Sequence, residues 1–102
     1  MTTEKRRLPV KSTRVNLDGD YEGFYAVARL NMPCSFFMAL AESASMAERH
    51  ALWAPYILEW NILDDDGADL PVSAESLAAL PLDMFRMLID KINEAMEAPK
   101  SA

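Results

Sequence analysis

The chain has 102 residues, of which 51% are apolar and 25% charged, and this composition is typical of one globular domain with a single core. Its formal net charge of −6 argues against a protein that binds nucleic acid or an anionic membrane over its whole surface, because such surfaces are basic. Cys34 is the single cysteine, which excludes an internal disulfide and a multi-cysteine zinc site. No uncharged apolar run approaches the roughly 20 residues of a membrane span.

Basic residues are concentrated at the start of the chain. Residues 1–14 hold five of them against one acid, Glu4, whereas the remainder is strongly acidic; the five are Lys5, Arg6, Arg7, Lys11 and Arg14. We expect residues 1–10 to form a flexible basic arm. The arm is either a solvated terminus or a segment that docks on an acidic partner or on nucleic acid, and the sequence leaves both open.

Two runs of alternating polarity predict a β-hairpin. Residues 11–17 and 24–30 each place apolar side chains at every second position, the pattern of a half-buried strand. Asp18-Gly19-Asp20 between them is a turn signal, because Gly19 can adopt a positive φ and aspartates bond nearby amides.

Two short helices are expected next, near 34–43 and 46–54, either separate or merged. Pro33 suits a first helical turn, and Ser45 with Glu48 matches the capping box, in which serine and glutamate satisfy free backbone amides. Pro55 ends this helical region.

Residues 56–63 form the clearest predicted strand. We expect its alternate apolar side chains to face the core, with Glu59 and Asn61 behind them; these side chains are Tyr56, Leu58, Trp60 and Ile62. The run Asp64–Asp66 with Gly67 then breaks the strand.

Two helices are expected after this turn, at 74–80 with Ser73 as N-cap and then from Pro81 onward. The last helix carries an amphipathic stripe and ends before Pro99; the stripe consists of Phe85, Leu88, Ile89, Ile92 and Met96. The order of elements predicts a small single α+β domain over 11–97: a hairpin, a third strand, three to four short helices and a C-terminal amphipathic helix. Residues 98–102 are expected to be a disordered tail.

The sequence favours no catalytic or metal site. An EF-hand loop with Gly67 at its sixth position would need oxygen ligands at Ile62 and Ser73, so the aspartate run is interpreted as a solvated turn. Cys34 and His50 lack a third orienting group, and we interpret Cys34 as a small buried hydrophobe and His50 as an exposed helix residue. We expect no enzyme activity and no cofactor.

Methionines in the last helix suggest a partner surface. Met84 and Met87 flank the amphipathic stripe and would widen it beyond what one face can bury. The hypothesis is that a helical partner, or a second copy of this chain, binds to Met84, Phe85, Met87, Leu88, Ile92 and Met96. Arg86, Asp90, Lys91 and Glu94 would form its polar rim.

The second half of the chain carries a family resemblance. Residues 60–67 (WNILDDDG), 70–73 (LPVS) and 80–83 (LPLD), followed by the amphipathic helix, resemble the tail assembly chaperones of long-tailed, siphovirus-type bacteriophages. The upstream hairpin is similar to that of the same group, so the resemblance extends over about residues 10–97. It is a pattern of hydrophobic, turn and proline positions and contains no catalytic signature.

The resemblance implies a non-enzymatic assembly factor in the cytoplasm of the bacterial host. Such chaperones coat the tape-measure protein and keep it soluble until tail-tube subunits polymerise around it, and they are absent from the mature virion. The implied partners are therefore the tape-measure protein and tail-tube subunits, with no nucleic acid and no membrane; a homo-oligomer stays open. The alternatives are a structural head–tail connector or tail-completion protein of the virion, and a small regulatory protein that binds a host protein.

Overall fold

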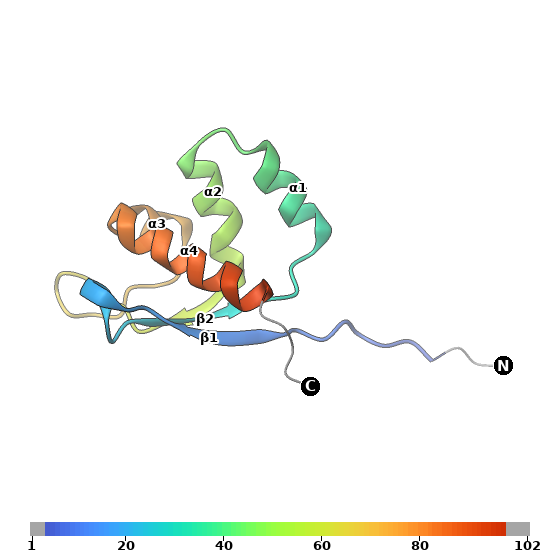
Figure 1. Cartoon of the computed structure of the whole chain (residues 1–102), viewed down its shortest axis with the longest axis horizontal. Helices are drawn as coiled ribbons and strands as arrows, with labels where there is room; N and C mark the ends of the chain where they lie inside the picture. Colours follow the sequence, from blue (N-terminus) through green and yellow to red (C-terminus); the bar gives the residue numbers. More distant parts are fainter. Residues whose placement is uncertain (1–3, 98–102) are drawn as a thin grey trace.

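A computed structural model describes residues 4–97 of the chain. One antiparallel sheet has the order β1-β2-β3, formed by Ser12–Asn16, Tyr25–Arg29 and Ile57–Trp60. The helices α1 (Cys34–Glu42), α2 (Met46–Trp53), α3 (Ala74–Ala79) and α4 (Leu82–Glu97) all lie on one side of this sheet (Figure 1). The predicted α+β class is confirmed, while the expected tail of residues 98–102 lies outside the described residues.

The hairpin forms as its alternation predicts. Val15 pairs with Ala26 across β1 and β2, and both face the core, where they are 6% and 2% exposed. A short 3-10 helix, Gly19–Tyr21, connects the strands, and Gly19 begins it with φ +60°, a conformation that glycine adopts without strain.

Capping residues set the helix boundaries. The Ser45 hydroxyl accepts from the Glu48 amide at 3.2 Å, and the Glu48 carboxylate accepts from the Ala44 amide at 2.8 Å, so α2 begins separately from α1. The Ser73 hydroxyl caps α3 by accepting from the Ser76 amide at 3.0 Å. A merged helix over 34–54 is therefore wrong.

Strand β3 differs from its prediction because it contains a bulge. Glu59 pairs with Val27, but Ala28 pairs with Ile57, so two residues of β3 oppose one of β2. The extra residue reverses the alternation. Ile57 is 3% exposed in the core, whereas Leu58, expected in the core, is 48% exposed.

Trp60 and Ile62 remain on the core side of the chain after the bulge. Ile62 is 9% exposed, and Trp60 is half-buried. The Trp60 indole Nε1 donates to the Leu70 carbonyl at 2.6 Å, which ties the loop after β3 to the sheet. Tyr56 lies in the 3-10 helix Ala54–Tyr56, where its ring meets Phe36 edge-on with centroids 5.1 Å apart.

The bulge predicts that substitutions at two adjacent residues lower the stability of the fold by very different amounts. Ile57→Ala should lower the free energy of unfolding by about 3 kcal/mol, because it removes buried methyl groups. Leu58→Ala should change it by less than about 1 kcal/mol, because about half of that residue is already exposed to solvent. Urea denaturation of the two variants measures both, and equal losses would contradict the observed register.

Candidate functional site

Helix α4 contributes side chains to the core and to three grooves on the surface. Its apolar stripe is buried: Phe85, Leu88 and Ile92 are 5%, 2% and 0% exposed. These side chains belong to one core with the inward residues of the sheet. The stripe is therefore packed inside the domain, as a single core of a small protein requires.

The residues predicted to bind a partner do not form one surface. Met84 is 4% exposed, so the expectation that it leaves free apolar area is wrong. It belongs to the core and lies next to Leu80 and to residues of the loop after β3. Met87 and Met96 are half-buried and pack against the core.

Polar side chains of α4 hold the hairpin turn in place. The Lys91 ammonium forms an ion pair with the Asp18 carboxylate at 2.9 Å, and the Tyr21 hydroxyl donates to the Asp83 carboxylate at 2.6 Å. The Met87 sulfur accepts from the Asp18 amide at 3.5 Å. Three contacts thus join residues far apart in the sequence, between α4 and the link between β1 and β2.

These contacts shift two pKa values upward. Hydrogen bonding to Asp83, followed by burial and the charges of Asp83 and Asp20, raises the pKa of Tyr21 above its ordinary 10.0. Hydrogen bonding to Asp18 and its charge raise the pKa of Lys91 above 10.5. A raised folded-state pKa stabilises the fold below the unfolded value and loses that effect as pH rises through the folded value, so both contributions disappear only under alkaline conditions.

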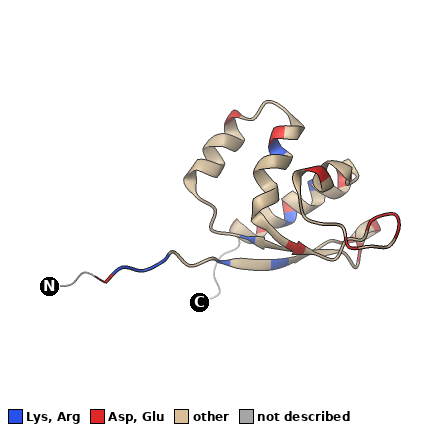
Figure 2. Ribbon diagram, turned by 180° about the vertical axis from the view of Figure 1, so that it is seen from behind, with Lys and Arg blue, Asp and Glu red and all other residues tan. Residues whose placement is uncertain are grey.

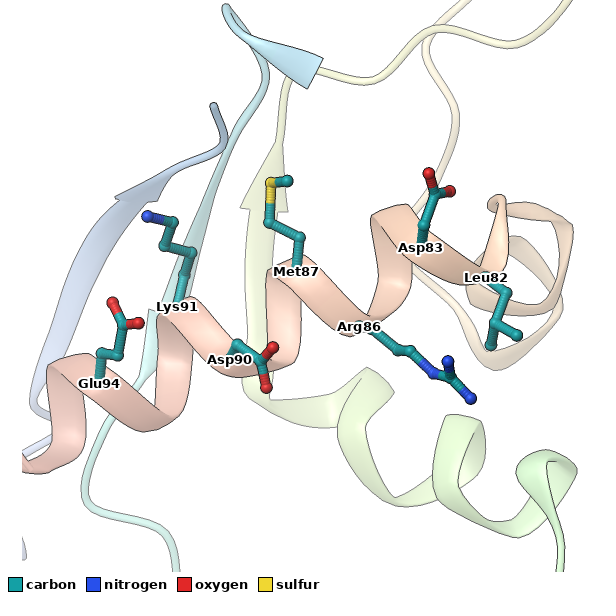
Figure 3. Close-up of a pocket in the computed structure, with 7 residues that line it drawn as sticks. All are labelled: Leu82, Asp83, Arg86, Met87, Asp90, Lys91 and Glu94. Atoms are coloured by element: carbon teal, nitrogen blue, oxygen red, sulfur yellow. The ribbon is translucent and has the colours of Figure 1, made fainter. Parts of the chain in front are cut away.

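The exposed side of α4 forms a shallow, charged groove, here the polar groove, of about 640 Å³ (Figure 3). Met87, Lys91 and Asp83 extend toward the hairpin, while Arg86 extends toward α2. Of the expected polar rim, Arg86, Asp90 and Glu94 are exposed, and Lys91 is engaged by Asp18.

A second groove lies between α4 and the first two helices. This helical groove has a volume of about 540 Å³ and is walled by α1, α2 and α4. Its floor is apolar and its rim polar; the floor consists of Leu40, Met46, Trp53, Phe85 and Ile89, and the rim of Arg49, Arg86, Asp90 and Asn93. Phe85 is the one member of the predicted partner set that lines it.

The contribution of α1 to the helical groove was not predicted from the sequence. Phe37 and Met38 are 46% and 67% exposed, and Phe37 lies one turn before Leu40, so it extends the apolar wall of the helical groove. The adjacent aromatics Phe36 and Phe37 indicate such an exposed apolar side chain, because a helix beside a core can bury only one of two neighbouring aromatics. Phe36 is that buried residue, at 2% exposure.

Cys34 and His50 occupy different positions from those expected. Cys34 is an exposed free thiol at the first residue of α1, so its interpretation as a buried hydrophobe is wrong. His50 is half-buried in α2, with its ring edge-on to Phe85 at 4.7 Å between centroids. Cys34 begins a helix, and His50 packs between α2 and α4.

The aspartate run folds as a turn. The Asp64 carboxylate accepts from the amides of Asp66 and Ala68 at 2.9 and 3.0 Å, and Gly67 has φ +82°. Within residues 4–97, no three His, Cys, Asp or Glu side chains are grouped to hold a metal ion. Over the same residues, none of the helices has the length and apolarity to cross a bilayer.

Comparisons with known proteins add no relative: no protein-family model matches the chain, and neither curated proteins nor solved structures give a significant match.

The Tyr21–Asp83 hydrogen bond predicts the effect of removing one charge. In a Tyr25→Phe, Tyr56→Phe background, Asp83→Asn should lower the pKa of Tyr21 toward its ordinary 10.0, because the main cause of the shift is lost. Ultraviolet titration of tyrosinate measures this pKa directly. Asp90→Asn, on the same helix and not in contact with Tyr21, is the matched control and should leave it unchanged; an unchanged pKa in Asp83→Asn as well would contradict the contact.

Proposed function

We propose that this chain is a non-enzymatic assembly factor that binds a helical protein in the helical groove, and that it acts as a phage tail assembly chaperone for the tape-measure protein. The observation that carries the proposal is the groove itself, which has a volume of about 540 Å³ between three helices and is lined by both apolar and polar side chains. Grooves of this kind accept the apolar face of an amphipathic helix.

The side chains around the groove suit that role. Phe37, one turn before Leu40 in α1, is 46% exposed and adds apolar area next to the groove. Met46 on the floor is flexible and can adapt to different sequences along a long partner. Arg49 and Arg86 on the rim would contact carboxylates of the partner helix and set its orientation.

The identity of the partner rests on the family resemblance of residues 60–83 and the hairpin before them. A tape-measure protein is a long helical chain that would aggregate if its apolar faces stayed exposed. Copies of an acidic protein, each with a groove between its helices, could cover such faces repeatedly. The proposed location is accordingly the cytoplasm of the bacterial host, with no retention in the finished virion.

Gene neighbourhood separates this proposal from its alternatives. A chaperone gene should lie between a tail-tube gene and a very long tape-measure gene. A head–tail connector or tail-completion protein would instead be retained in purified particles, and a regulatory protein would bind a host protein. Absence of a tape-measure gene would remove the chaperone proposal in favour of the regulatory one.

Two leucine substitutions test the groove. Leu40→Glu places a carboxylate on the apolar floor and should weaken binding to the tape-measure protein at least about tenfold, because the charge would be buried without a partner. Leu58→Glu makes the same change on β3, outside the groove, and should bind normally. Co-expression and the soluble fraction of the tape-measure protein give the readout.

Circular dichroism and thermal melting check that both variants fold. If Leu40→Glu does not fold, Phe37→Glu repeats the test at a side chain that is 46% exposed. A folded groove variant that keeps the tape-measure protein as soluble as wild type does would exclude the helical groove as the binding site.

A further inference from the structure

The two ends of the molecule carry opposite charge. The arm before β1 is basic, and the loop between β3 and α3 is acidic and lies at the far end of the domain (Figure 2). Lys5, Arg6 and Arg7 belong to the first end, and Asp64, Asp65 and Asp66 to the second. The two segments are almost 60 residues apart in the sequence, and the fold places them at opposite ends of the domain.

An apolar groove opens at the acidic end. This loop groove has a volume of about 360 Å³, and apolar side chains of the hairpin, the loop and the start of α4 form its walls; they include Phe24, Leu63, Leu70, Leu80 and Met84. Leu63 is 54% exposed at its edge. Asp64 and Asp65 complete the lining, so the groove combines apolar walls with a negative rim.

The aspartates of the rim have no cationic partner within residues 4–97. The ion pairs in that part of the chain join Arg6 to Glu4 and Lys91 to Asp18. The backbone amides that bond Asp64 fix the shape of the loop without neutralising its neighbours. The loop groove therefore presents an ordered, unneutralised negative surface to a ligand.

The arm has the complementary chemistry. Leu8 and Val10 are 86% and 62% exposed, and the three basic residues come directly before them. Exposed apolar side chains next to a run of positive charge match an apolar groove with a negative rim.

The arm cannot reach the loop groove of its own chain. Asn31 holds it at the start of β1, since its side chain accepts from the Lys11 amide and donates to the Pro9 carbonyl. Residues 5–8 lie within four residues of Pro9 and extend at most about 14 Å from it. The groove lies past the other end of β1, more than about 20 Å from Pro9 at the rise of an extended strand.

We propose that the arm of one copy binds in the loop groove of a second copy, with Leu8 against the apolar walls and Lys5–Arg7 against Asp64–Asp66. The contact joins two different surfaces, so it is heterologous, and a pair of copies joined in this way still has one arm and one groove free. Repetition produces open chains or rings of subunits. The inference rests on the arm and the groove alone and is independent of the partner in the helical groove.

Charge reversal with rescue tests the proposal. Sedimentation velocity of the full chain, from about 10 µM to about 1 mM in about 50 mM salt, should show mass rising beyond a dimer, and about 500 mM salt should reverse the rise because the Debye length shortens. Arg6→Glu with Arg7→Glu should weaken association at least about tenfold, and so should Asp65→Lys with Asp66→Lys. All four side chains are exposed, so folding should be unaffected.

Mixing the two double variants gives the decisive result. Each one repels itself, but the reversed arm of the first matches the reversed loop of the second, and their unaltered surfaces match as well. The mixture should therefore recover assembly. A wild-type chain that stays monomeric at low salt, double variants that assemble like wild type, or a mixture that does not assemble would each overturn the proposal.

A leucine pair tests the apolar part of the contact. Leu8→Ser should weaken assembly severalfold, while Leu82→Ser, at a leucine that is 50% exposed outside the loop groove, should not. Equal effects of the two substitutions would exclude Leu8 from the groove.

Discussion

The fold depends on how large side chains fill the space above a central strand of small ones. Strand β2 faces the helices with Ala26 and Ala28, which are 2% and 0% exposed and occupy little volume. Aromatic side chains from three helices, Phe36, Trp53 and Phe85, fill the space that the alanines leave, with Phe36 and Trp53 in edge contact at 4.9 Å. Phe85, Leu88 and Ile92 of α4 are committed to this core, so the part of α4 left for a partner is the edge that faces α1 and α2.

Local signals were sufficient for most of the fold. The hairpin followed from alternation around Gly19, and the starts of α2 and α3 followed from Ser45 and Ser73, because a cap acts within one helical turn. The turn at Asp64–Gly67 likewise follows from side chains that bond their own backbone. For the two caps and the turn, the decisive contact spans four residues or fewer.

Features that depend on packing between distant segments were not predictable. The bulge at Ile57–Leu58 follows from pairing with β2, and no residue type in the strand indicates it. Met84 is buried in the core beside the loop after β3, and the bond from Trp60 to Leu70 ties that loop to the sheet. The helical groove depends on α1 and α2 lying beside α4, and the helical periodicity of one segment does not indicate which helices lie next to it.

Each surface around α4 has its own proposed role. The side with the polar groove holds the hairpin, the helical groove accepts a helix of a partner, and the loop groove accepts the arm of a second copy. Binding of a helical partner between α1, α2 and α4 is open to a direct test. Hydrogen exchange measured by mass spectrometry, with and without the tape-measure protein, should show added protection in residues 37–50 and 86–93 and none in 12–29. Protection confined to the hairpin, or no protection despite binding, would contradict it.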